Sequence, residues 1–275
     1  MRLLVTGAAG LLGRELLRSA ALRGHEVVPA YHSAGVDGGV RLDVRRRDAV
    51  REVIRTVRPD GIIHAAYRQD DWATTADGAV NVALAAGAAR LVFVSSDAVF
   101  SSRKSAWTED EPPHPETAYG AAKAAAETTI RALTPAAVIA RTSIIVGSDG
   151  TSGEELRVRR LATSAQCPSS VAAEGASARQ ESFFTGNIRC PIHVEDLAAA
   201  LLELLPSDAA GVVHLAGPEA LSRHQLGRLI AIRDGLDPDA LPSTPGVPSN
   251  ILLDAQRTQA AISTRLRPPW EFLAR

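Results

Sequence analysis

The chain has 275 residues, enough for one large domain or for a domain with a smaller appendage. Its formal net charge of -1 gives no electrostatic reason to expect a nucleic acid or an anionic membrane surface as partner. Two cysteines, Cys167 and Cys190, are too few for a disulfide framework or a metal cluster. No apolar run approaches the ~18 residues of a membrane span. We therefore expect a cytoplasmic globular protein with no metal site.

The first half of the chain alternates short apolar runs with segments of helical spacing. The apolar runs predict strands at 2–7, 25–31, 61–66, 90–96 and 136–145. The intervening segments predict helices at 11–24, 45–60, 76–89 and 118–127. Strands that alternate with helices predict an α/β fold, a doubly wound parallel sheet covered on both faces.

From about residue 148 the alternation loosens. Residues 163–182 are rich in Ser, Ala and Gly without a period, and predict a long mobile loop. An amphipathic helix is expected at 193–205 and a last strand at 211–217. The proline-rich stretches that follow predict a small, irregular C-terminal region. The arginine-rich stretch at 41–50 is interpreted as a solvated helix face rather than a binding surface.

A glycine pattern stands between the first predicted strand and the first helix. Gly7, Gly10 and Gly13 are spaced three apart in "TGAAGLLG". Such a turn lets the backbone approach a pyrophosphate, which the free N–H groups of the helix N-terminus then hold. We expect the whole turn to contact a dinucleotide cofactor, including Ala9, Leu11 and Leu12.

The end of the second strand bears on which dinucleotide is bound. An acidic residue there binds the ribose hydroxyls of NAD, but this strand ends with Tyr31, His32 and Ser33. The missing carboxylate removes a repulsion that would exclude a 2′-phosphate, so NADP is favoured over NAD. Asp43, followed by Val44, is either a hydrogen-bond partner for the adenine edge or an ordinary turn aspartate.

Tyr119 and Lys123 lie four residues apart on a helix that is otherwise almost pure alanine. The choice of lysine is notable, because only two of the 30 Lys and Arg residues are lysines. An ammonium one helical turn from a phenol lowers the pKa of that phenol by favouring the phenolate. Lysine also ends in a compact point charge, whereas arginine ends in a flat fork, so the two side chains are not interchangeable.

These motifs together resemble the extended branch of the short-chain dehydrogenase/reductase superfamily. The matching segments are the glycine turn, "HAA" at 64–66, "VSSDAVF" at 94–100 and "YGAAK" at 119–123. Within that branch the chain is similar to the dTDP-4-dehydrorhamnose reductase family. The resemblance implies a Rossmann-like core at 1–147, to which 188–216 returns. It also implies a smaller substrate-binding region at 148–187 and 217–275.

The resemblance implies roles for named residues. Tyr119 would protonate the substrate carbonyl oxygen, Lys123 would support it and bridge the nicotinamide ribose, and Ser96 would hydrogen-bond the substrate. Ala65, Ala66 and Tyr67 would adjoin the cofactor. Residues considered for the substrate side are Gln69, Asp70, Asp71, Trp72, Asp97, Arg141 and Arg189. Two histidines, His64 and His193, are interpreted as core residues.

The implied activity is NAD(P)H-dependent reduction of a keto group, with the 4-keto group of a nucleotide-activated deoxysugar as substrate. Two alternatives remain open: sugar-nucleotide epimerisation or dehydration, and a non-catalytic regulatory subunit like the β subunit of methionine adenosyltransferase. A homodimer is also open.

The chain departs from the family pattern at two places. Thr75 stands where the family carries an asparagine, and Asn81 matches only a later asparagine. The loop at about 164–182 is longer than the family's usual segment.

Overall fold

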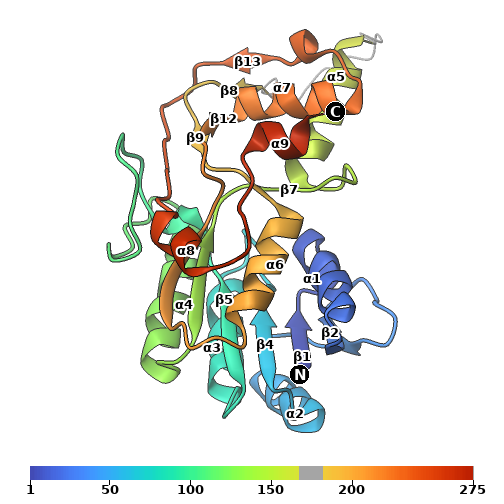
Figure 1. Cartoon of the computed structure of the whole chain (residues 1–275), viewed down its shortest axis with the longest axis vertical. Helices are drawn as coiled ribbons and strands as arrows, with labels where there is room; N and C mark the ends of the chain where they lie inside the picture. The colour runs from blue at the N-terminus through green and yellow to red at the C-terminus, as the bar shows by residue number, and fades with distance from the viewer. Residues whose placement is uncertain (167–181, 275) are drawn as a thin grey trace, which may run out of the picture.

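A seven-stranded parallel sheet forms the centre of the computed structural model, which describes residues 1–166 and 182–274 (Figure 1). Its strand order, β11-β6-β5-β4-β1-β2-β3, is the order of a doubly wound nucleotide-binding sheet. The strands are β1 Arg2–Thr6, β2 Glu26–Tyr31, β3 Val40–Arg41, β4 Gly61–His64, β5 Arg90–Val94, β6 Val138–Thr142 and β11 Gly211–Leu215. The central strands are buried on both faces, which is why they read as unbroken apolar runs.

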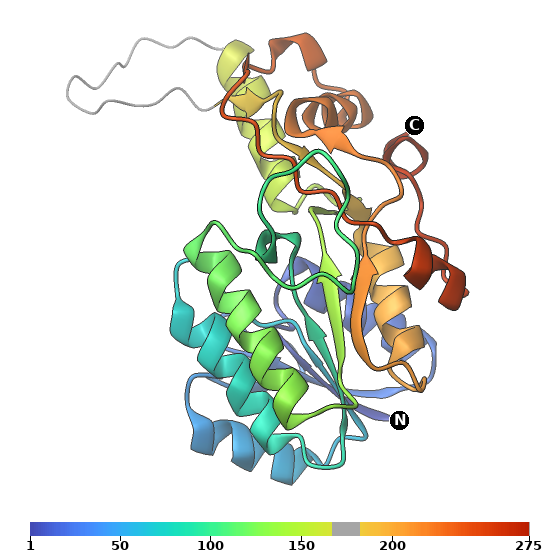
Figure 2. The same cartoon turned by 90° about the vertical axis from the view of Figure 1, so that its left-hand side faces the viewer.

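Helices cover both faces of this sheet. Helices α1 (Leu11–Leu22) and α6 (Val194–Leu204) pack together on one face, around a single apolar cluster. Helices α2 (Arg47–Val57), α3 (Gly78–Ala85) and α4 (Ala118–Leu133) lie side by side on the other face (Figure 2). The predicted α/β fold with a doubly wound parallel sheet is therefore confirmed.

A smaller region lies at the opposite end of the molecule from the N-terminus (Figure 1). It holds the helices α5 (Gly153–Gln166), α7 (Arg223–Asp234) and α9 (Pro269–Leu273), which have an apolar cluster of their own. Short strands complete it in pairs: β7 Ile145–Val146 with β10 Ile192–His193, β9 Ile188–Arg189 with β12 Leu221–Ser222, and β8 Phe183–Phe184 with β13 Ser243–Thr244.

The later chain is more regular than predicted. Helix α7 runs for 12 residues between the last predicted strand and the proline-rich stretches, where no element was predicted. Its start carries a capping box, in which the Ser222 and Gln225 side chains each bond the other's backbone N–H. Gly235 ends it in a left-handed conformation with φ of 73°. Residues 163–166 of the predicted loop belong to α5, and its remainder up to 181 lies outside the described residues.

The division into a core at 1–147 and 188–216 and a smaller region at 148–187 and 217–275 stays a proposal. Helix α8 (Gln256–Ala261), from the second of these sets, packs beside β11 of the core sheet. Within the described chain, no helix combines the length and apolar character that crossing a membrane requires.

Leu16 tests the packing of α1 onto the sheet. It is fully buried in the cluster shared with α6, whereas Leu22 on the same helix is 76% exposed. We expect Leu16→Ala to lower the free energy of unfolding by about 2–5 kcal/mol through lost contacts and a residual cavity. Leu22→Ala is the matched control and should change it by less than about 0.5 kcal/mol. Urea unfolding followed by circular dichroism measures both, and equal effects would contradict the packing described here.

Candidate active site

The glycine turn joins β1 to α1 and is shaped by close backbone contacts. Gly7 has φ of +72°, and a Cβ there would lie 2.8 Å from the Ala65 carbonyl carbon. A Cβ on Gly13 would lie 2.2 Å from the Gly7 carbonyl oxygen, so no side chain fits. Gly10 begins α1 without a side-chain cap. The turn thus leaves an uncapped helix N-terminus at the carboxyl edge of the sheet, which suits a pyrophosphate.

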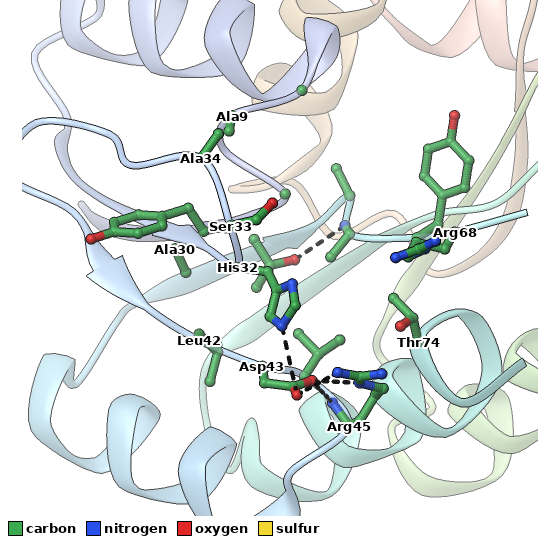
Figure 3. Close-up of a pocket in the computed structure, with 18 residues that line it drawn as sticks. Ala9, Ala30, His32, Ser33, Ala34, Leu42, Asp43, Arg45, Arg68 and Thr74 are labelled. Atoms are coloured by element: carbon green, nitrogen blue, oxygen red, sulfur yellow. Dashed lines mark hydrogen bonds and ion pairs between the residues drawn. The ribbon is translucent and has the colours of Figure 1, made fainter. Parts of the chain in front are cut away.

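One cavity opens on the β2 side of this turn. It has a volume of about 270 Å³ and is shown in Figure 3; we call it the β2-side cavity. It is lined by eleven residues predicted to bind the cofactor: Gly7, Ala9, Gly10, Tyr31, His32, Ser33, Asp43, Val44, Ala65, Ala66 and Tyr67. The chain segments that the sequence suggested for the adenosine half of a dinucleotide therefore converge here.

Three charged or titratable side chains meet at the floor of the β2-side cavity (Figure 3). Arg45 donates to both carboxylate oxygens of Asp43, with Nε–Oδ1 and Nη2–Oδ2 distances of 2.9 and 2.8 Å. His32 Nε2 lies 3.7 Å from Asp43 Oδ2. The hydrogen bond from Arg45 lowers the pKa of Asp43 to about 2. The carboxylate is therefore paired with a cation rather than presented alone to a ligand.

Arg45 was not predicted as a site residue. It stands in the arginine-rich stretch interpreted as a solvated helix face, but α2 begins only at Arg47 and Arg45 lines the cavity. Asn81 contributes from α3, because its Nδ2 donates to the Val44 carbonyl oxygen at 3.0 Å and fixes this loop. The one sequence signal that could have singled out Arg45 is Asp43, two residues before it.

A larger cavity of about 930 Å³ opens on the α4 side of the glycine turn; we call it the α4-side cavity. It meets the β2-side cavity at Gly7, Gly10, Ala65 and Tyr67, which line both. The predicted cofactor residues Leu11, Leu12 and Gly13 line it, as do Ser96, Tyr119 and Lys123. A dinucleotide lying across the glycine turn would therefore reach the Ser-Tyr-Lys set.

Helix α4 brings these catalytic candidates together. Thr117 caps it, its Oγ1 accepting the Gly120 N–H at 3.0 Å. A Cβ on Gly120 would lie 1.9 Å from the Ala98 carbonyl oxygen, so glycine allows the helix to lie directly on the turn that follows Ser96. Lys123 is buried and donates from Nζ to the Val94 carbonyl oxygen at 2.7 Å.

The pKa values differ from the sequence-based expectation. Burial raises the pKa of Tyr119 well above its ordinary range, and only the hydrogen bond with Ser96 lowers it. The Tyr119 pKa is therefore raised rather than lowered as expected, because burial is the largest effect on this phenol. Burial also lowers the pKa of Lys123 to about 7, against an opposing effect of Glu127. Both cases follow from the loss of water around a charged form.

The substrate-side predictions divide into two groups. Gln69, Asp97 and Arg189 line the α4-side cavity, and Arg189 Nε lies 3.6 Å from Asp97 Oδ2. Arg141 does not reach it, because its buried guanidinium pairs with Glu127 at 2.8 Å. Trp72 is half exposed and lines neither cavity.

Other residues considered at the sequence level are accounted for by local contacts. Asp70 pairs with Arg68, and Asp71 accepts from Thr74.

Glu154 and Arg223 were not predicted, yet they form an ion pair that lines the α4-side cavity. Glu154 lies at the start of α5 and Arg223 at the start of α7, and the sequence analysis identified neither helix.

The two core histidines are buried as predicted. His64 Nδ1 is 2.6 Å from the Thr6 hydroxyl, and burial lowers the pKa of His64 to about 3. His193 caps α6 by accepting the Glu195 N–H. Neither histidine lines the two cavities.

A doubly wound sheet whose glycine turn adjoins a Ser-Tyr-Lys set is the architecture of an extended short-chain dehydrogenase/reductase. Residues 1–268 match the family model described as the RmlD substrate binding domain, and the chain belongs to that family.

Named proteins share this similarity. The dTDP-4-dehydrorhamnose reductase of Mycolicibacterium smegmatis is 30% identical over 290 residues, which cover 97% of this chain and 82% of that protein. Methionine adenosyltransferase 2 subunit beta of Xenopus laevis is 28% identical, over 84% of this chain and 71% of its own. The crystal structure of a Bacillus anthracis dTDP-4-dehydrorhamnose reductase in complex with NADP superposes with a TM-score of 0.81. That alignment covers 99% of this chain and 96% of the other at 23% identity, and shows the shared fold.

Gly13 tests the role of the turn. We expect Gly13→Ala to weaken NADPH binding at least about tenfold, equivalent to ~1.4 kcal/mol, because its Cβ would push α1 away from the Gly7 carbonyl. Gly35→Ala is the control, since a Cβ on Gly35 meets nothing within 4 Å. Isothermal titration calorimetry of both variants decides the matter. Unchanged affinity in Gly13→Ala would show that the turn does not hold the cofactor.

Proposed function

We propose that the protein is an NAD(P)H-dependent reductase that reduces the 4-keto group of a nucleotide-activated deoxysugar. One observation carries the proposal: Ser96, Tyr119 and Lys123 line the larger of two cavities that meet at a dinucleotide-type glycine turn. Membership of the RmlD family and the similarity to a dTDP-4-dehydrorhamnose reductase support the substrate class. We also propose a cytoplasmic location, with the sugar nucleotide as its small-molecule partner.

The residues of the α4-side cavity suit reduction of a ketone. The chemistry that a bound NADPH supplies is hydride donation to the carbonyl carbon. Tyr119 keeps its proton at neutral pH because burial raises its pKa, so it is available to donate that proton to the carbonyl oxygen. Ser96 hydrogen-bonds Tyr119 and would hold the same oxygen. The Lys123 ammonium would stabilise the phenolate that remains.

The rest of the cavity suits a large polar substrate. From the catalytic residues it extends to Arg189 on β9 and Arg223 on α7, so the smaller region forms one of its walls. Arginine side chains bind phosphate groups through charge-assisted hydrogen bonds. We therefore propose that this wall holds the nucleotide diphosphate of the substrate, with the sugar ring beside Ser96 and Asp97.

We propose NADP as the preferred cofactor. The end of β2 carries no acidic residue, since Tyr31, His32 and Ser33 stand there and line the β2-side cavity. Asp43, the one acidic residue among those that line this cavity, is paired with Arg45. Half of the Arg45 side chain is exposed, so it is accessible to a 2′-phosphate.

A non-catalytic regulatory role is the second candidate, because methionine adenosyltransferase 2 subunit beta is also a relative. A subunit that only binds has no need of Ser96, Tyr119 and Lys123 in one cavity. An epimerase or dehydratase would return its cofactor unchanged. Two incubations separate all three. With a 4-keto sugar nucleotide, a reductase oxidises one NADPH per product. With the corresponding 4-hydroxy sugar nucleotide, an epimerase or dehydratase forms product without net cofactor consumption, and a binding subunit forms product from neither.

Substitutions of the tyrosine and the lysine test the mechanism. We expect Tyr119→Phe to lower kcat by roughly 10²–10⁴-fold, the usual range for losing a general acid, and to leave NADPH affinity unchanged. Lys123→Arg should lower both kcat and NADPH affinity, because a guanidinium is the wrong shape at the ribose. Lys104→Arg, at the chain's other and exposed lysine, is the matched control. Full ketone reduction by Tyr119→Phe would exclude the acid role.

Arg45 tests the cofactor preference. We expect Arg45→Ala to weaken NADPH binding about 10–100-fold, the range for losing a hydrogen bond to a charged group, while NADH binding stays the same. Arg55→Ala is the control, because Arg55 pairs with Glu52 on the exposed surface of α2. Fluorescence titrations with both cofactors measure the ratio. An equal loss for NADH and NADPH would mean that Arg45 does not read the 2′-phosphate.

A further inference from the structure

Two catalytic residues of α4 are joined to the segment that follows β5. Lys123 Nζ donates to the Val94 carbonyl oxygen at 2.7 Å. Tyr119 lies beside the Ser96 side chain, which lowers the pKa of its phenol. These α4 residues are four apart and lie on the same side of the helix. That side of α4 therefore faces the segment after β5 and bonds it through Lys123.

A third residue on the same side of α4 makes a contact that the proposed mechanism does not use. Glu127 lies four residues after Lys123 and is 1% exposed. Its Oε1 accepts the Ser95 hydroxyl at 2.5 Å. Arg141, also 1% exposed, donates to it from Nη2 at 2.8 Å and from Nε at 3.1 Å. The carboxylate thus binds the residue immediately before Ser96 and is paired with a guanidinium.

The burial of Lys123 makes its protonation sensitive to the nearby Glu127 carboxylate. The Lys123 Nζ lies 4.7 Å from the Phe93 ring centre and 5.3 Å from that of Tyr67. Burial disfavours the ammonium, and Glu127 is the group that opposes this effect of burial. The titratable groups around Lys123 are His64 from β4, Tyr67 from the loop after β4, Asp97 after β5, and Tyr119 and Glu127 from α4.

We propose that Glu127 is a positioning residue for the reduction: it fixes Ser95, and with it Ser96, against α4, and its charge favours the protonated form of Lys123. The proposal rests on the reductase function proposed above. It assigns two separable effects to one carboxylate. The hydrogen bond to Ser95 sets the geometry of Ser96, and the negative charge sets the protonation of Lys123.

Two variants separate these effects. Ser95→Ala removes the hydrogen bond and leaves the ion pair of Glu127 with Arg141 intact. Glu127→Gln alone would leave Arg141 charged and unpaired in the core, which endangers folding. We therefore combine Glu127→Gln with Arg141→Met, which removes both charges while the glutamine oxygen can still accept the Ser95 hydroxyl. Glu155→Gln with Arg233→Met is the matched control, because this buried ion pair lies outside α4.

Direct titration of Lys123 tests the charge effect. The chain has two lysines, so lysine labelled with ¹³C at Cε gives two signals, and Lys104→Arg identifies that of Lys123. In the wild type this signal should titrate near the Lys123 pKa of about 7. In Glu127→Gln/Arg141→Met the midpoint of this titration should fall by about 1 pH unit. NADPH affinity, which decreases as Lys123 loses its proton, should then decrease at a correspondingly lower pH. An unchanged midpoint would overturn this half of the proposal.

Kinetics test the positioning effect. For Ser95→Ala we expect kcat to fall by about 10–100-fold, with KM, NADPH affinity and the Lys123 titration unchanged. A wild-type kcat in Ser95→Ala would overturn the positioning role. If the wild type reduces no ketosugar nucleotide, the proposed function fails. The lysine titration still decides whether Glu127 controls the charge of Lys123.

Discussion

The site depends on how closely α4 lies against the turn after β5. Gly120 makes this approach possible, because any side chain there would overlap the Ala98 carbonyl. The small buried residues Ala122 and Ala126 keep the rest of the helix equally near the sheet. At this distance Lys123 reaches the Val94 carbonyl. An alanine-rich helix is thus the means by which one tyrosine and one lysine are placed beside Ser96.

The same approach brings a charged group into the interior. Lys123 is 2% exposed, and this burial favours its neutral form. Glu127, which is paired with Arg141 and does not line the cavity, opposes that effect. A polar network inside an apolar core is stable only when its members are paired, and here the pairing connects the end of β5, α4 and β6. The same buried network therefore joins three elements of the fold and surrounds Lys123.

Local patterns predicted the sheet and its covering helices because buried parallel strands and amphipathic helices leave clear periods in a sequence. They also singled out Tyr119, Lys123 and the glycine turn, whose spacing is local, whereas Ser96 came from the resemblance to the family. Contacts between distant segments were not predictable in this way. Arg141 was taken for a ligand-binding residue because the sequence does not show that α4 brings Glu127 to it. Arg45 was overlooked because its neighbours are solvated arginines, and α7 because arginines interrupt its apolar face.

The scarcity of lysine has a consequence for handling the protein. Reagents that couple proteins to a support through primary amines can react at exposed amines only. Of the two lysines, Lys104 is exposed and Lys123 is buried. Among the side chains of these 275 residues, such reagents therefore have a single exposed amine to react with. Molecules immobilised through Lys104 would share one orientation, with the Lys123 amine unmodified.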